Sequence, residues 1–312
     1  MFSSNGMSLM NEKPPFRSLL PVAQTFSAAV FGSVGFWQRH QIPIRCLLGS
    51  KCGRSLSSRV SAILILLMIC AQSSLFAQVK APAASPRRAA MRVPFVGCKS
   101  DGQMGPAEAP AGKNKIVRLP AEAAQRLAYY NFKQGFGVLA PRGWYCFGTY
   151  GSGGHTLYVS PHPIDTARLF SGNWDGFAGP AIEVSHEYGD TSGRFGVAST
   201  IARVFPAHRE FVRDVIKEGI EPASSFPFGP YPKDKLTYKS KEIVEYETPA
   251  QTEGLGTKSW LQKNADPISG VAILLGQTPD LLQLAARLPP EFADLTSPII
   301  QQVERDAAQT QY

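Results

Sequence analysis

The stretch Phe136–Ser160 reads FGVLAPRGWYCFGTYGSGGHTLYVS, and it decides the fold class. Apolar and aromatic residues recur on both sides of two turn-forming segments, Pro141–Gly143 and Gly151–Gly154. Alternation with a period of two indicates strands, and clusters of Pro and Gly mark the turns between them. The stretch therefore predicts a β-meander of three strands. These strands are expected over Phe136–Ala140, Trp144–Tyr150 and Thr156–Ser160.

The same signals predict further strands downstream. They are expected over Ala181–Tyr188, Leu236–Lys239, Glu242–Thr248 and Gly270–Leu275. The last of these is apolar on both faces, which is typical of a central strand. Leu281–Leu288 fits both a strand and a helical spacing, and we favour the strand.

Three helices are expected around these strands. Pro120–Phe132 and Ala207–Glu218 have apolar residues at helical spacing, and Ser297 before Pro298 is typical of the start of a C-terminal helix. The apolar stripe of that last helix would be Ile299, Ile300 and Val303. Runs of strands with few helices predict an α+β fold, with a mainly antiparallel sheet flanked by a few helices after a disordered N-terminal leader.

The N-terminal third of the chain contains a stretch with the features of an export signal. Ala62–Ala71 is uninterrupted AILILLMICA, with Arg54 and Arg59 before it and a small residue, Ala77, at a suitable cleavage position. A membrane-spanning helix needs about 20 consecutive apolar residues, and this run is half that length. We therefore predict a signal peptide over residues 58–77 and a periplasmic or secreted protein. In the alternative, residues 60–77 are retained and anchor the chain in a membrane.

The rest of the chain divides around this signal. Residues 1–57 show no clear periodicity, and we interpret them as a non-native extension from a misassigned start codon or as a disordered segment. Residues 78–92 are rich in Ala, Pro and Arg, which is typical of a flexible linker. Residues 93–312 contain no repeat or composition break, and they are expected to form a single globular α+β domain.

Most of the basic excess belongs to the leader. The chain has a formal net charge of +8, but residues 1–77 account for +6 of it. The remaining +2 is too small to predict nucleic acid as a partner. A membrane becomes a partner only if residues 62–77 stay uncleaved.

Two cysteines lie beyond the leader, Cys98 and Cys146. An even pair in an exported domain predicts one disulfide. Two buried free thiols remain the alternative, since Cys is often simply a small core residue.

The chain resembles two groups of known proteins. Pro141, Gly143 and Trp144, together with the order of elements, resemble the PsbP-like α/β/α sandwich, in which a strand ends in Pro-x-Gly-Trp. That group shares no catalytic site, so the resemblance implies a fold alone. Through Tyr150–Gly154 and Tyr246–Pro249, the chain also resembles uncharacterised exported proteins of environmental bacteria, which implies no activity.

The Gly148–His155 segment is the first place where chemistry could lie. Ser152 would be a nucleophile with His155 close in sequence, but the Gly-x-Ser-x-Gly pattern is absent because Tyr150 occupies its first position. A hairpin turn whose glycines need positive φ is the interpretation we favour.

The strand over Ala181–Tyr188 carries the other ionisable candidates. His186 and Glu187 are neighbours and should point to opposite faces, with His186 on the apolar one. Glu183 and Glu187 share the other face, as in a paired-carboxylate site, although we favour a solvated face. No metal site and no cofactor are predicted.

Aromatic residues in loops are the last candidates for binding. They are Trp174 and the set Phe226, Phe228 and Tyr231, which would form a stacking platform if exposed together and loop anchors if buried. We favour an exported, non-enzymatic domain that binds an unknown ligand or envelope protein. The alternative is a hydrolase with its site near residues 148–155, so enzymatic activity stays an open question.

Overall fold

The structure is a computed structural model that describes residues 89–310. Its strands are β1 Ala89–Val93, β2 Phe95–Gly97, β3 Lys99–Gly102, β4 Lys115–Leu119, β5 Leu127–Asn131, β6 Val138–Pro141, β7 Tyr145–Gly151, β8 Gly154–Ser160, β9 Ala181–Glu187, β10 Lys235–Tyr238, β11 Ile243–Thr248, β12 Ile268–Leu275 and β13 Asp280–Arg287. Its α-helices are α2 Ala121–Arg126, α3 Thr166–Phe170, α4 Arg194–Val204, α5 Arg209–Lys217 and α6 Thr296–Thr310. Short 3₁₀ helices are η1 Pro206–His208, η2 Ala223–Ser225, η3 Leu255–Lys258 and η4 Pro290–Leu295.

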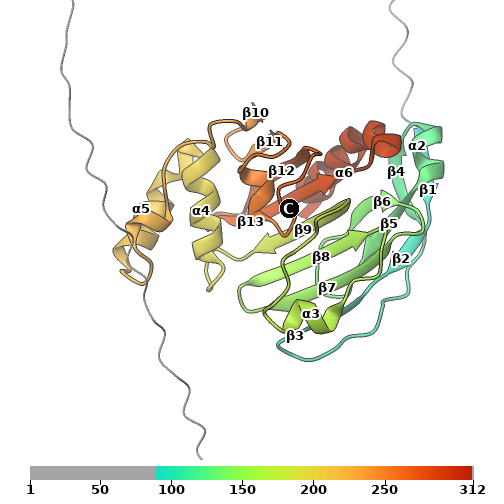
Figure 1. The fold of residues 1–312 in the computed structure, drawn as a ribbon, viewed down its shortest axis with the longest axis horizontal. Helices are drawn as coiled ribbons and strands as arrows, with labels where there is room; N and C mark the ends of the chain where they lie inside the picture. The colour runs from blue at the N-terminus through green and yellow to red at the C-terminus, as the bar shows by residue number, and fades with distance from the viewer. Residues whose placement is uncertain (1–88, 311–312) are drawn as a thin grey trace, which may run out of the picture. The chain divides into compact units, whose positions relative to one another are not determined.

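An eight-stranded sheet organises the domain, in the order β10-β11-β12-β13-β9-β8-β7-β3 (Figure 1). All its pairings are antiparallel except that of β3 with β7. A three-stranded sheet, β2-β5-β6, and a two-stranded sheet, β1-β4, accompany it. The predicted α+β class with a mainly antiparallel sheet and few helices is confirmed.

One hydrophobic core fills the space between the large sheet, the two small sheets and α6. Alternate residues of the central strands enter it, among them Ile182 and Val184 of β9 and Val271 and Ile273 of β12. The opposite residues of β12 and β13 pack against α4 and α5 in a second core. Layers therefore cover both faces of the central strands, which accounts for the apolar character of both faces of β12.

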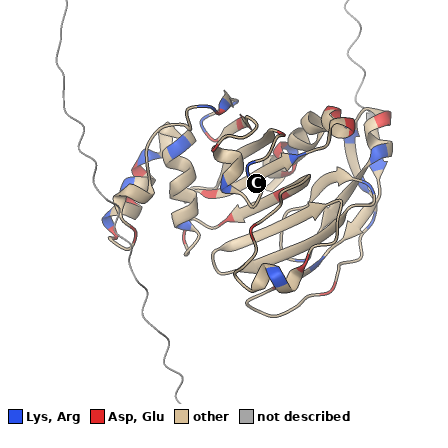
Figure 2. Cartoon of the chain, viewed as in Figure 1, with Lys and Arg blue, Asp and Glu red and all other residues tan. Residues whose placement is uncertain are grey.

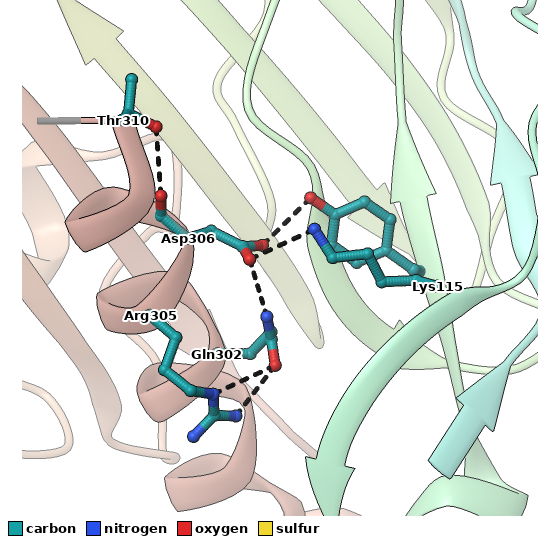
Figure 3. A network of polar contacts seen from close by, with 6 residues as sticks. Lys115, Gln302, Arg305, Asp306 and Thr310 are labelled. Atoms are coloured by element: carbon teal, nitrogen blue, oxygen red, sulfur yellow. Dashed lines mark hydrogen bonds and ion pairs between the residues drawn. The ribbon is translucent and has the colours of Figure 1, made fainter. Parts of the chain in front are cut away.

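A polar network attaches α6 to the first core (Figure 3). Asp306 is buried, and its carboxylate accepts hydrogen bonds from the Tyr129 hydroxyl at 3.1 Å and from Gln302 Nε2 at 2.7 Å. Lys115 Nζ of β4 lies 3.2 Å from the same carboxylate. One carboxylate thus joins α6 to both small sheets.

The disulfide predicted between Cys98 and Cys146 is confirmed, with a Cα–Cα distance of 5.4 Å. Cys98 lies between β2 of the three-stranded sheet and β3 of the large sheet, and Cys146 lies in β7, so the bond fastens the crossing between the two sheets to β7. Disulfides persist in proteins that fold in an oxidising compartment. In residues 89–310, no helix is both long and apolar enough to cross a membrane.

Several sequence predictions hold at the level of single elements. Strands β9, β10, β11 and β12 lie where they were expected, and Leu281–Leu288 is a strand, β13. The amphipathic helix over Ala207–Glu218 appears as η1 and α5. Helix α6 begins at Thr296, so Ser297 lies inside the helix and is not its N-cap as predicted, but the stripe of Ile299, Ile300 and Val303 is buried as expected.

The helix predicted over Pro120–Phe132 is wrong in its second half. Helix α2 ends at Arg126, and the chain continues directly into β5. Tyr129 and Tyr130 of β5 pair with β2 on one side and β6 on the other. Pairing on both sides satisfies the backbone of these buried residues, and this tertiary contact outweighs the helical spacing of their side chains.

The β-meander predicted from Phe136–Ser160 is partly wrong. Strands β7 and β8 form the expected hairpin, and β9 continues it. Strand β6, however, pairs with β5 in the three-stranded sheet, so the chain changes sheets at the turn after Pro141. The predicted linker over residues 78–92 is also wrong at its end, because residues 89–92 belong to β1, which pairs with β4. The extension 1–57, the signal 58–77 and residues 78–88 lie outside the described residues.

Candidate functional site

Two glutamates of β9 lie beneath helix α4. Glu183 and Glu187 point to the sheet face opposite Ile182 and Val184, as the strand period requires. The solvated face that we favoured for them is wrong, because Glu183 is 5% exposed and Glu187 is partly buried. Helix α4, which the sequence analysis missed, packs across β9 and β13 and takes this face away from water.

These carboxyl groups border a cavity of about 290 Å³, which we call the carboxylate pocket. Its floor comes from three adjacent strands, with Thr156, Glu183, Ser185, Glu187 and Gln283. Its roof is the face of α4 that carries Gly196, Ser199 and Thr200. Its rim is the segment Lys258–Trp260, which follows η3. Nearly every lining side chain can form hydrogen bonds.

Glu183 is the most deeply buried ionisable group in the pocket. Its Oε2 accepts a hydrogen bond from the backbone N–H of Trp260 at 2.8 Å. Burial raises the pKa of Glu183 to about 7, the Trp260 hydrogen bond opposes that rise, and the nearby charge of Glu187 adds to it. Glu183 therefore exchanges a proton near neutral pH instead of staying ionised.

Glu187 lies at the other end of the pocket, against α4. Burial raises its pKa to about 7 as well, and its Oε2 is buried without a hydrogen-bond partner. That oxygen lies 2.1 Å from where a Cβ at Gly196 would stand, so only glycine leaves room for the carboxyl group there. Glu187 also borders a neighbouring cavity of about 430 Å³ beside the β7–β8 hairpin.

The indole of Trp260 at the rim is stacked on that of Trp174, which lies outside the pocket lining. The ring centroids of Trp174 and Trp260 lie 4.9 Å apart at an interplanar angle of 28°, and Trp260 is 46% exposed. The guanidinium group of Arg287 is buried behind them and donates to carbonyl oxygens of Phe177, Ala178, Gly179 and Gln262. Arg287 thereby joins the loop that carries Trp174 to the segment that carries Trp260.

A histidine pair occupies the opposite face of the same strands. His155 and His186 are direct partners in the β8–β9 ladder, and their ring centroids lie 5.0 Å apart. Tyr188 places its hydroxyl 2.9 Å from His155 Nδ1, and Asp280 approaches His186 Nε2 at 3.6 Å. Burial, followed by the neighbouring His186, lowers the pKa of His155 to about 4, and burial lowers that of His186.

Ser152 lies apart from both groups. It is exposed at the tip of the β7–β8 turn, where its backbone N–H and its hydroxyl bind the side chain of Gln103. In the described part of the chain, no hydrogen bond links Ser152 to His155. Of the turn's glycines, Gly154 alone has positive φ, at 145°, and a Cβ there would stand 2.1 Å from the carbonyl oxygen of His186.

The aromatic candidates are separated by burial. Phe226 and Tyr231 are buried in the second core, where they anchor the loop between α5 and β10. Phe228 is 47% exposed and lies beneath the guanidinium group of Arg209. The three side chains therefore form no common platform. Trp174 instead stacks on Trp260, a rim residue of the carboxylate pocket that the sequence analysis did not single out, and itself borders a separate cavity beside α3.

Sequence reasoning missed several pocket residues besides Trp260. Thr200 and Gln283 are each 7% exposed and line the carboxylate pocket. The spacing of Val197, Ile201 and Val204 would have indicated the buried face of α4. No sequence signal marks Gln283 as a site residue, since it lies within the apolar strand β13.

Charged residues of both signs are interspersed over the ribbon (Figure 2). Among residues 89–310, no cluster of three or more His, Cys, Asp or Glu side chains has an arrangement that could hold a metal ion.

In comparisons with known proteins, the chain matches no family model, no curated protein and no solved structure.

Proposed function

We propose that this chain is an exported bacterial protein, periplasmic or secreted, whose domain binds a small polar ligand in the carboxylate pocket without catalysing a reaction. The observation that carries the proposal is a buried carboxyl group, Glu183, on the floor of a cavity of about 290 Å³. Burying an ionisable group costs free energy, and such groups are concentrated at functional sites. The disulfide and the apolar run at Ala62–Ala71 support export.

The non-enzymatic interpretation follows from the arrangement of the groups. In residues 89–310, no hydrogen bond connects a serine or cysteine nucleophile to a base that a third group orients in turn. Ser152 binds Gln103, and the hydrogen bond of His155 goes to Tyr188. The pocket instead offers acceptor and hydroxyl groups around a small volume, as small-molecule sites do.

A pocket-filling variant tests the proposal. Ser199→Trp places an indole in the pocket from the roof helix and leaves both glutamates in place. A panel of small polar compounds would be screened by ligand-observed NMR against the wild type, Ser199→Trp and Ser224→Trp, the last at an exposed position outside the pocket. We expect at least one compound to bind the wild type and Ser224→Trp and to lose binding to Ser199→Trp. If no compound shows this pattern, the binding proposal is wrong.

Export is tested by intact mass. Protein recovered from the envelope or culture fraction of a bacterial host should begin near Gln78, after the predicted cleavage at Ala77, and gain two hydrogens on reduction. A mass that retains residues 60–77 would show an anchored protein and reject the cleaved form.

A hydrolase remains the second candidate, because two carboxyl groups with pKa values of about 7 share one pocket. Such groups can donate and accept protons near neutral pH. Turnover of glycoside, ester or peptide substrates that is abolished by Glu187→Gln would establish it. The same screen with Ser152→Ala tests the site first expected near residues 148–155.

A further inference from the structure

Among the described residues, the carboxyl groups of Glu183 and Glu187 have no counter-charge. Within residues 89–310, neither carboxyl group forms an ion pair with a basic side chain. Lys258, the one basic residue among those lining the pocket, is exposed on the rim. A buried carboxyl group is either protonated or paired, so above its pKa each glutamate is expected to take its counter-charge from outside the chain.

The free hydrogen-bonding capacity of the pocket is mainly that of an acceptor. Gln283 lines the pocket, and its Nε2 donates to the Tyr246 hydroxyl at 3.3 Å and the Leu255 carbonyl at 3.4 Å, so both donors of its amide are used within the protein. In the described chain, Glu187 Oε2 is buried without a hydrogen-bond partner, and no hydrogen bond is made by the side chain of Thr200, which is also buried. A carboxylate oxygen accepts hydrogen bonds and a hydroxyl can accept or donate one, so a ligand that brings donors matches both groups.

The rim adds a surface that attracts cations. Trp260 lines the pocket with an indole that is 46% exposed and is held in place by stacking on Trp174. The face of an indole attracts ammonium and guanidinium groups. The pocket volume of about 290 Å³ is larger than a single ion fills. The pocket therefore has room for a cation with a carbon skeleton, which can lie against the indole of Trp260.

We propose that the carboxylate pocket binds a small organic cation carrying one or two ammonium groups, with Glu183 and Glu187 as its counter-charges. This inference rests on the proposed binding function and names the ligand class of the same site. The ammonium groups donate to the free acceptors, and the carbon chain lies against Trp260.

Binding of such a cation should depend on pH. The groups facing Glu183 are the hydroxyls of Tyr158 and Tyr246, the carboxyl group of Glu187 and the ammonium group of Lys258 on the rim. Both glutamates have pKa values of about 7, so a cation must displace protons from them below that pH. Affinity should therefore rise with pH between about 5.5 and 8.

Calorimetric titration with 1,4-diaminobutane tests the inference, with 1,4-butanediol as the uncharged analogue of the same length. The disulfide-bonded exported chain should bind the diamine at least 10-fold more tightly than the diol at pH 8, and at least 10-fold more tightly at pH 8 than at pH 5.5. Glu187→Gln should weaken diamine binding at least 10-fold, whereas Glu253→Gln, at an exposed loop position, should leave it unchanged.

The possible failures are distinguishable. If the diol binds as tightly as the diamine and both lose binding to Ser199→Trp, the pocket is a ligand site but the cation inference is wrong. If diamine binding survives in Ser199→Trp, the diamine associates with the surface charge and the inference is overturned. If no compound of the polar panel binds the wild type and loses binding to Ser199→Trp, the proposed function itself fails. MgCl₂ would be compared with NaCl at the same ionic strength. If only MgCl₂ displaces the diamine, the site binds an inorganic cation and the inference is also overturned.

Discussion

The imidazole rings of His155 and His186 lie with their centroids 5.0 Å apart across the β8–β9 ladder. Phe136 stacks on His155 and meets His186 edge-on, so an apolar ring closes the pair on one side. The Nε2 atom of His155 and both ring nitrogens of His186 are buried without a hydrogen-bond partner. Two imidazoles so placed resist protonation, because each added charge would be both buried and next to the other ring.

The histidine pair should make the domain sensitive to acid. His155 has a folded-state pKa of about 4, below its ordinary value of 6.5, so the unfolded chain binds more protons between these values. Its contribution to the free energy of unfolding is present above pH 6.5 and falls by about 3 kcal/mol as the pH drops to 4. In urea denaturation across this range, the free energy of unfolding of the wild type should fall relative to that of His155→Gln as the pH is lowered. His162→Gln, at an exposed histidine, should show no such trend; an equal trend in both variants would contradict the assignment.

Glu183 should have the opposite effect at alkaline pH. Its folded-state pKa of about 7 lies above the ordinary 4.5, so its contribution to the free energy of unfolding is lost as the pH rises from 4.5 to 7 and stays lost above that. Glu183→Gln retains an acceptor for the Trp260 N–H and should raise the free energy of unfolding at pH 8 by up to about 3 kcal/mol. The gain should shrink as the pH falls below 7 and vanish near 4.5. Glu253→Gln serves as the exposed control, and a gain that does not change with pH would count against burial as the cause.

The disulfide should account for a large share of the domain's stability. Cys98 and Cys146 are separated by 48 positions, and closing a loop of that size stabilises a fold by about 4 kcal/mol in the chain-entropy model. The double variant Cys98→Ala/Cys146→Ala should lose up to that amount in guanidinium denaturation. Reduced wild type is the matched control and should unfold at the same midpoint as the variant. A variant as stable as the oxidised wild type would show that the cross-link contributes nothing.

Asp306 should be the most costly polar residue of α6 to remove. Asp306→Ala leaves the Tyr129 hydroxyl, Gln302 and Lys115 without their shared carboxylate (Figure 3). Because the carboxylate is buried, we expect a loss of about 3 kcal/mol in the free energy of unfolding. Asp294→Ala removes an exposed pair with Arg126 and should cost less than about 1 kcal/mol. Equal losses would show that burial does not decide the cost.

Gly196→Ala separates stability from binding. Alanine is favoured over glycine in a helix by about 1 kcal/mol, so α4 should be at least as stable in the variant. The new methyl group occupies the position of the Glu187 carboxyl group and must displace it, since the present distance is 2.1 Å. We expect an unchanged or higher melting temperature and about 10-fold weaker binding of 1,4-diaminobutane. Undiminished binding would show that Glu187 takes no part in the site.

The side-chain pattern of a single segment was sufficient to predict a feature wherever the burial of that segment followed from its own residues. The apolar run of β12 predicted a central strand, and β12 does lie between β11 and β13. The alternation along β9 correctly placed His186 on the apolar face and the two glutamates on the other. Cys98 and Cys146 were paired because no other cysteine lies beyond the leader. These features need no knowledge of distant contacts.

Distant contacts decided the remaining features. Tyr130 had helical spacing with Ala123 and Leu127 but is paired on both sides in β5, and β6 pairs in a second sheet instead of joining the expected meander. The burial of Glu183 depends on α4, a helix whose residues follow β9 but whose position across β13 no local period reveals.

The sequence by itself determined the α+β class, most strands, the disulfide and the faces of β9, because side-chain period and composition act over neighbouring residues. Only the tertiary structure decided which face became a pocket. The strand pattern predicts that Glu183 and Glu187 share a side. Their burial and their raised pKa values arise from α4 and the Trp260 segment, which come from other parts of the chain.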